Sequence, residues 1–146
     1  MEREYPLRPW VGIGVVLLRD ERVLLVRRAR APALGEWSLP GGAQHLGETA
    51  EAAARRELAE ETGLEAGPLA LLAHADAIHH DQAGQVIYHY TILDFCGHWL
   101  AGVPQPQDDV TEARFVPRAD LDSYALRAAT REIIDRAFSL AVSGLR

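Results

Sequence analysis

The amino-acid sequence predicts one domain of the α+β class, in which a mixed β-sheet carries helices on its faces. Its 146 residues are 48% hydrophobic and 25% charged, which is typical of a single globular domain, so we expect residues 1–146 to form one domain. Apolar runs of strand length lie on both sides of a strongly helical segment, and a second helical pattern follows the last of them. This order argues against a regular series of parallel βαβ units.

Two apolar runs near the start predict a β-hairpin. Residues 10–19 and 22–28 are rich in β-branched side chains and leucine, and a short acidic break separates them. A third, shorter strand is expected at residues 37–39. Residues 40–42 predict a loop, because two glycines that follow a proline permit backbone angles that other residues resist.

The Ala- and Glu-rich stretch at residues 49–62 predicts a helix. Thr49 suits the N-cap, since its hydroxyl can accept a hydrogen bond from a free amide of the first turn, and Gly63 suits the left-handed residue that ends a helix. The later patterns predict strands at residues 69–79, 85–96 and 113–117, a loop at 102–109 and a helix at 126–142. The last helix is expected to bury Ile133, Ile134, Ala137, Leu140 and Ala141.

Charge and composition exclude several classes of protein. The net charge is −6 and all 15 basic residues are arginine, which argues against binding to polymeric nucleic acid and removes the lysine that Schiff-base and Walker-type sites need. Residues 11–18 are too few to span a membrane and no apolar leader precedes them, so we expect a cytoplasmic protein without a membrane partner. Cys96 stands alone, which excludes an intrachain disulfide and predicts a core position.

Three carboxylates share one face of the predicted helix. Glu57, Glu60 and Glu61 fall within an arc of about 100°. Like charges at this spacing destabilise a helix by ~0.2–0.5 kcal/mol per pair, so the cluster requires a compensating cation. Carboxylate oxygens favour hard cations, Mg2+ first and Mn2+ second. A salt-bridged surface helix is the alternative, and Arg56, one turn before Glu60, supports it.

A longer motif surrounds this helix face. The pattern G-x5-E-x7-R-E-U-x-E-E-x-G-U, with U an aliphatic residue, is complete from Gly42 to Leu64. Its nine defined positions over 23 residues are far more specific than a lone glycine-rich loop. The pattern resembles the Nudix box, and residues 35–41 are similar to the G-x-W-x-L-P-G segment that precedes the box in that family.

The resemblance implies a Nudix-type α/β/α sandwich with a mixed sheet, a catalytic loop and helix after the first strands, and a C-terminal helix. It implies a small MutT-like or ADP-ribose pyrophosphatase-like hydrolase that cleaves a nucleoside diphosphate linked to another moiety. It makes Glu57, Glu60 and Glu61 the catalytic metal ligands, joined by the Gly41 carbonyl, with Mg2+ as the expected ion and Mn2+ as the second candidate. Attack on an anionic phosphate needs the positive charge and the activated water that such ions supply.

The same correspondence assigns structural tasks to four residues of the motif. Gly42 belongs to the loop, Glu48 and Arg56 would form the ion pair that fixes the loop on the helix, and Gly63 would end the helix.

The proton acceptor for the attacking water is less defined. Glu57 and Glu61 are the nearest carboxylates, whereas Asp108, Asp109 and Glu112 belong to a later loop and strand that could also supply it. We take Glu57 as the working hypothesis.

Substrate contacts are expected from the second strand and the middle of the chain. Arg27 and Arg28 fall on opposite faces of a strand, and we select Arg27 because a guanidinium suits bidentate phosphate binding. Tyr88 is selected among the aromatic and histidine side chains that could stack on a base or ribose, with cross-strand packing as the alternative. Asp109 and Glu112 complete the expected substrate-binding set.

The substrate stays open among ADP-ribose, nucleoside triphosphates, oxidised deoxynucleoside triphosphates and dinucleoside polyphosphates. The proline that some ADP-ribose-cleaving members carry beyond the box is replaced here by His80. A non-catalytic Nudix-like domain that senses a nucleotide is the alternative function, and the complete glutamate set favours the enzyme. Homodimers are common in the family, so the assembly is open between a monomer and a homodimer.

Overall fold

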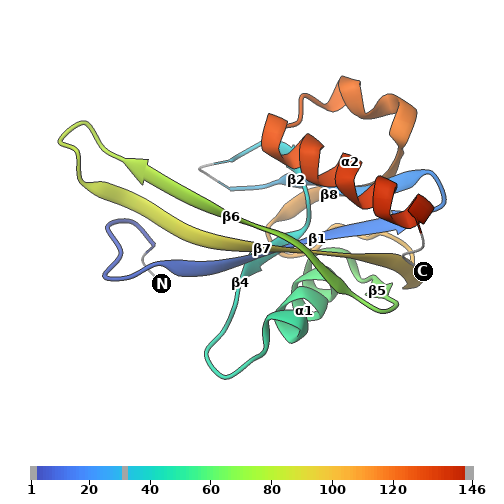
Figure 1. Ribbon diagram of the computed structural model, residues 1–146, viewed down its shortest axis with the longest axis horizontal. Coiled ribbons are helices and arrows are strands. Elements are labelled where there is room, and N and C mark those ends of the chain that lie inside the picture. The colour runs from blue at the N-terminus through green and yellow to red at the C-terminus, as the bar shows by residue number, and fades with distance from the viewer. Residues whose placement is uncertain (1–2, 31–32, 144–146) are drawn as a thin grey trace.

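The structure, a computed structural model, describes residues 3–30 and 33–143, without the side chains of residues 142 and 143. It confirms the α+β class, because a mixed sheet lies between helix α1 (Ala50–Thr62) on one face and helix α2 (Ala128–Ser143) on the other (Figure 1). A 3-10 helix, η1 (Arg118–Tyr124), precedes α2. The strands are β1 (Trp10–Arg19), β2 (Arg22–Arg28), β3 (Trp37–Ser38), β4 (Gly41–Ala43), β5 (Glu65–Ala66), β6 (Ala70–His80), β7 (Val86–Ala101) and β8 (Val110–Pro117).

The sheet opens where the first two strands diverge. β1 pairs antiparallel with β2 at the hairpin end, where Leu18 faces Val23, and it runs parallel to β7 along almost its whole length. Beyond the hairpin, β4 pairs with β1, and β3 pairs with β2. The chain between β3 and β4 therefore fills the gap, and the Pro40 carbonyl accepts a hydrogen bond from the Val15 amide at 3.0 Å.

The loop expected at residues 40–42 contains the start of a short strand instead. Gly41 and Gly42 lie in β4 and pair with Gly14 and Ile13 of β1. A Cβ atom on Gly41 would collide with the Ile13 carbonyl, so the missing side chain is what allows the two backbones to approach. The glycines therefore serve close strand pairing rather than a free turn.

Helix α1 begins and ends where the sequence predicts. The Thr49 hydroxyl accepts a hydrogen bond from the Ala52 amide at 3.0 Å. Gly63 has a φ of 73° and donates its amide to the Ala59 carbonyl. Small alanines and Leu58 form the buried side of the helix, so its backbone packs closely on the sheet.

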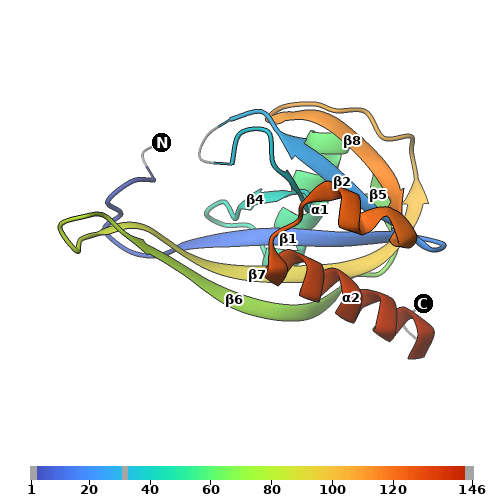
Figure 2. The same ribbon diagram turned by 90° about the horizontal axis from the view of Figure 1, so that it is seen from above.

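Two hydrophobic cores lie on opposite faces of the sheet, because side chains along β1 alternate between them. The core under α1 contains Val15 and Leu17, and the core under α2 contains Val16 and Leu18. Cys96 lies in the second core, as predicted. The arrangement is the α/β/α sandwich that the sequence resemblance implies, and Figure 2 shows α2 from above on the face of the sheet where it contacts β1 and β6.

Several elements differ from the sequence prediction. The local patterns predict neither β5 nor η1, and β7 and β8 extend beyond their predicted bounds. In α2, Leu140 is 40% exposed although its spacing predicts burial, whereas Phe138 is 3% exposed. The other four predicted residues, Ile133, Ile134, Ala137 and Ala141, lie in or against the core under α2, and Phe138 is buried where Leu140 was expected.

The β6–β7 hairpin extends well past the rest of the sheet in both views (Figures 1 and 2). The Asp81 side chain closes its turn by accepting hydrogen bonds from two backbone amides of the turn. Tyr5 docks the N-terminal segment on the hairpin, since its amide donates to the Ile87 carbonyl and its hydroxyl donates to Asp81. No helix in the described part of the chain has the length and apolar character needed to cross a membrane.

Candidate active site

The three glutamates predicted on one helix face lie together at one cavity. Glu57 and Glu61 are 8% and 2% exposed, whereas Glu60 is exposed to solvent. The cavity has a volume of about 430 Å³ and lies where α1, β4, the end of β2 and the loop before β8 meet. Its lining also includes Arg28, Gly41, Gly42, Arg56, Asp108 and Asp109.

Arg56 links the loop to the helix and to two of the glutamates. Its Nη2 atom lies 2.7 Å from Glu48 Oε1, which forms the predicted ion pair, and it also donates to the Ala43 carbonyl. Its Nη1 atom lies 2.7 Å from Glu57 Oε1 and 3.2 Å from Glu60 Oε2. The hydrogen bonds from Arg56, with that from the His45 amide, lower the pKa of Glu48 to about 2.

Glu61 is the most buried of the three carboxylates. Its Oε1 atom accepts a hydrogen bond from the Gly41 amide and its Oε2 atom accepts one from Arg28 Nη1, each at 3.0 Å. Burial nevertheless raises its pKa to about 7, because desolvation outweighs the charge of Arg28 and the nearby Glu57 adds repulsion. The two donors therefore leave this buried charge incompletely compensated.

Gly42 gives Glu57 the space that it occupies. A Cβ atom at Gly42 would lie 2.5 to 2.7 Å from the carboxylate atoms of Glu57. The glycine of the motif thus allows the loop to close over the helix with the carboxylate between them.

The donor set suits a hard divalent cation, since Glu57, Glu60, Glu61 and a backbone carbonyl all offer oxygen. Within residues 3–30 and 33–143, no three acidic, histidine or cysteine side chains stand in an arrangement that could hold a metal ion. Arg56 holds Glu57 and Glu60 in ion pairs, and Arg28 holds Glu61, so the salt-bridged alternative describes these side chains as they lie. Burial raises the pKa of Glu61 despite the charge of Arg28, so additional positive charge beside this carboxylate would lower its pKa again.

Arg27 and Arg28 lie on opposite faces of β2, as predicted, and Arg28 is the one that lines the cavity. Arg28 donates to Ser38, to the Leu39 carbonyl and to Glu61, so it positions the glutamate. Arg27 pairs instead with Glu112 at 3.1 Å, outside the lining of this cavity. Alternation along β2 places the two arginines on opposite faces of the strand. The way β1 and β2 diverge in the folded sheet determines which of these faces meets α1.

The other expected substrate residues divide between two places. Asp108 and Asp109 line the cavity, and Asp109 lies 3.0 Å from Arg30. Glu112 pairs with Arg27 and with Arg114, beside the cavity rather than in it. Tyr88 lies on the extended part of β7, with its ring 6.4 Å edge-on from His79, so cross-strand packing describes it as it stands.

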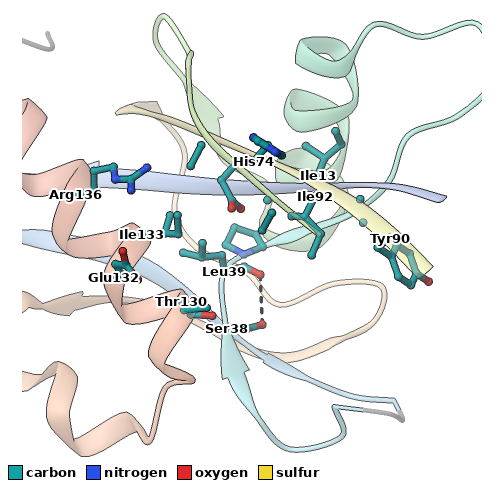
Figure 3. A pocket seen from close by; sticks show the side chains of 18 of the residues that line it. Ile13, Ser38, Leu39, His74, Tyr90, Ile92, Thr130, Glu132, Ile133 and Arg136 are labelled. Atoms are coloured by element: carbon teal, nitrogen blue, oxygen red, sulfur yellow. Dashed lines mark hydrogen bonds between the residues drawn. The ribbon is translucent and has the colours of Figure 1, made fainter. Parts of the chain in front are cut away.

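A second cavity of about 480 Å³ lies on the other face of the sheet, between β1, β6, β7 and the start of α2 (Figure 3). Its lining includes Tyr90, Ile133 and the buried carboxylate of Asp94. Neither this cavity nor Asp94 is predicted from the sequence. The signal that could have found it is a carboxylate between the apolar residues 92–93 and 95–96 of β7.

A family model described as NUDIX domain matches residues 8–137. The chain is similar to the ADP-ribose pyrophosphatase of Methanocaldococcus jannaschii, with 36% identity over 119 residues that cover 82% of this chain and 68% of that protein. It is 41% identical over 99 residues to the putative 8-oxo-dGTP diphosphatase 2 of Mycobacterium tuberculosis, covering 67% of each protein. The crystal structure of the MutT NUDIX hydrolase from Burkholderia pseudomallei has a TM-score of 0.73 and 32% identity, over 88% of this chain and 98% of that one.

Proposed function

Because this chain belongs to the NUDIX domain family and is a Nudix pyrophosphohydrolase, we propose that it hydrolyses the diphosphate bond of a nucleoside diphosphate linked to another moiety. Two substrate classes follow from the names of its relatives, ADP-ribose-type compounds and nucleoside triphosphates that include oxidised deoxynucleotides. The observation that carries the proposal is the convergence of Glu57, Glu60 and Glu61 on one cavity that also presents Arg28 and Arg56.

Members of this family generally use divalent metal ions, and we propose Mg2+ here, with Mn2+ as a substitute. Glu57, Glu60, Glu61 and the Gly41 carbonyl would hold the ion, because oxygen donors of this kind suit a hard cation. When bound, such an ion supplies positive charge to the phosphate oxygens and lowers the pKa of a coordinated water.

The protein's own groups orient the reactants and accept the proton. Arg28 and Arg56 hold the glutamates in place, and the Gly41 amide holds one oxygen of Glu61. Glu57 stays the working hypothesis for the general base, with Glu61 as the competing residue, since both carboxylates are buried at the cavity. Asp108 and Asp109 line the same cavity and extend the choice to the loop before β8.

Phosphate release in a coupled phosphatase assay tests the proposal. The panel contains ADP-ribose, NADH, dinucleoside polyphosphates, deoxynucleoside triphosphates and 8-oxo-dGTP, each with Mg2+, Mn2+ or EDTA. We expect metal-dependent release from at least one class, abolished by Glu61→Gln. Glu51→Gln is the matched control, because Glu51 lies on the same helix, exposed and outside the cavity.

An assay without phosphate release would contradict the proposal. Folded protein that releases no phosphate from any compound with either metal overturns hydrolysis and favours the nucleotide-sensing alternative. A shift in melting temperature with an uncleaved nucleotide then identifies the ligand that is sensed.

A further inference from the structure

Four arginines of the described chain line the glutamate cavity, and three of them are paired with carboxylates of this protein. Arg28 lies 3.0 Å from Glu61, and Arg30 lies 3.0 Å from Asp109. Arg56 is paired with the glutamates of the motif. A carboxylate at such a distance cancels most of the charge that its arginine presents to an incoming anion. These three arginines therefore position the site's own side chains and leave little positive charge for a substrate.

Arg3 is the fourth arginine, and no carboxylate of the described residues forms an ion pair with it. Its guanidinium carbon lies 5.3 Å from the centre of the Trp10 ring. A cation–π contact of this kind orients the guanidinium group without neutralising its charge. Arg3 therefore presents to the glutamate cavity a positive charge that no carboxylate compensates.

The N-terminal segment that carries Arg3 is fixed on strand β7. The Tyr5 amide donates to the Ile87 carbonyl at 2.8 Å, and the Tyr5 hydroxyl donates to Asp81 at 2.8 Å. Trp10 begins β1 and is the register partner of Tyr90 on β7. The backbone close to Arg3 and the ring beside its side chain are therefore both held by the same strand.

Arg3 lies at the border between the glutamate cavity and a third cavity. The third cavity has a volume of about 880 Å³ and lies between the N-terminal segment and residues 43–48. Arg3, Ala43 and His45 line both cavities, whereas Arg28 and Glu61 line only the glutamate cavity. A substrate that extends from the glutamates toward the third cavity would therefore pass Arg3.

A third phosphate group would bring further negative charge into a cavity that is already acidic. The lining includes five carboxylates, those of Glu57, Glu60, Glu61, Asp108 and Asp109. Like charges repel, so a phosphate beyond the first two is bound favourably only where an uncompensated cation faces it. A guanidinium group suits this task because its planar fork matches two phosphate oxygens. An ADP-ribose-type compound carries two phosphate groups and has no further anion for Arg3.

We propose that Arg3 binds a phosphate group beyond the two that the cleaved bond joins, and thereby selects substrates with three or more phosphates over ADP-ribose-type diphosphates. This inference rests on the proposed function and narrows its substrate classes to nucleoside triphosphates and other nucleoside polyphosphates. Removal of the guanidinium group should weaken the binding of polyphosphates and leave the binding of diphosphates almost unchanged.

Calorimetric titration with two uncleavable analogues in Mg2+ tests the proposal without any hydrolysis. The analogues are α,β-methylene-ADP and α,β;β,γ-bismethylene-ATP, which share one base and differ by one phosphate. We expect the wild type to bind the triphosphate analogue at least about 10-fold more tightly, and Arg3→Gln to reduce this preference to about 2-fold or less. The melting temperature of Arg3→Gln should equal that of the wild type, because Arg3 is exposed and forms no ion pair with a described residue.

Arg8→Gln is the matched control, because Arg8 is an exposed arginine of the same segment that lines the third cavity but not the glutamate cavity. A wild type that binds neither analogue or shows no preference, an unchanged preference in Arg3→Gln, or an equal loss in Arg8→Gln would overturn the proposal. A preference that depends on Arg3, without phosphate release in the assay above, would overturn hydrolysis alone. Phosphate release without such a preference would overturn the role of Arg3 alone.

Discussion

Two arginines explain how three carboxylates come to share one face of α1. Arg56 contacts Glu57 and Glu60 from within the helix, and Arg28 reaches Glu61 from β2. Each guanidinium also donates to a backbone carbonyl, that of Ala43 or Leu39, so the arginines are fixed before they orient the glutamates. The site therefore requires the forked arrangement of donors on a guanidinium group, and not its positive charge alone.

Replacing Arg56 with lysine tests this requirement. The ammonium of Arg56→Lys cannot contact Glu48, Glu57 and the Ala43 carbonyl together, so we expect the free energy of unfolding to fall by on the order of 1.5 kcal/mol. Urea denaturation measures the change. Arg22→Lys is the control, because Arg22 is exposed at the β1–β2 turn, and an equal loss in both variants would contradict the role of the fork.

Ionised Glu61 should lower the stability of the folded protein, although the activity requires this residue. Its pKa of about 7 lies above the ordinary 4.5, so folding favours the protonated form; this contribution is present below pH 4.5 and is lost as the pH rises through 7. In EDTA at pH 8, Glu61→Gln should therefore be more stable than the wild type, with a free energy of unfolding that is higher by at most about 3 kcal/mol. This difference should shrink toward pH 4.5. Activity should fall about 10²–10⁴-fold.

Melting curves of both proteins between pH 4.5 and 8 measure this difference in stability. A Glu61→Gln protein that is less stable than the wild type at pH 8 would show that Arg28 and the Gly41 amide compensate the charge fully.

At the scale of elements, the loop of β4 and the helix α1 act as one unit. β4 is held by β1, α1 is held by the core beneath it, and Glu48 and Arg56 join loop to helix. Gly42 sets the separation of the two elements, because its backbone lies against the carboxylate of Glu57.

Gly42→Ala should therefore damage activity more than stability. The added methyl group overlaps the Glu57 carboxylate and displaces it, and a displacement of about 1 Å can cost roughly 10²-fold in rate. Steady-state kcat/KM and melting temperature together measure the two effects. Gly67→Ala is the control, since its Cβ atom would lie 3.7 Å from the nearest neighbour, the His98 carbonyl. Equal activities of the two variants would contradict the role assigned to Gly42.

At the scale of the whole molecule, the sheet separates two cavities that lie on its opposite faces. The glutamate cavity lies toward α1, and the cavity of Asp94 lies toward α2. β4 lies between them, paired with β1 where β1 and β2 diverge. A homodimer stays a prediction of the family resemblance.

Binding of Mg2+ should stabilise the whole domain. At about 100 times its dissociation constant, an ion that binds the folded chain alone adds about 2.7 kcal/mol, which corresponds to a rise in melting temperature of roughly 5–10 °C for a domain of this size. Glu60→Gln should reduce the rise, and Glu65→Gln, an exposed glutamate beyond the helix, should keep it. An equal rise in both variants would place the ion elsewhere.

The sequence predicted α1 at its observed bounds, because the signals at Thr49 and Gly63 act within a few residues of the helix ends. It did not predict β4 or β5, since the glycines of β4 and the acidic start of β5 disfavour a strand locally and these segments become strands only through their partners on β1 and β7. Phe138 rather than Leu140 is buried in α2 for a similar reason, because the side chains that meet the sheet depend on how the helix is docked.

By itself, the sequence determined the helix with its three carboxylates, the complete motif around it and hence the reaction class, because spacing along one helix fixes which side chains share a face. The tertiary structure alone decided that Arg28 rather than Arg27 meets Glu61, and that Asp94 faces a cavity floored by Gly14. Contacts between distant segments follow from strand pairing and the divergence of β1 and β2. No local pattern in the chain encodes that divergence, so these neighbours emerge only when the whole sheet is assembled.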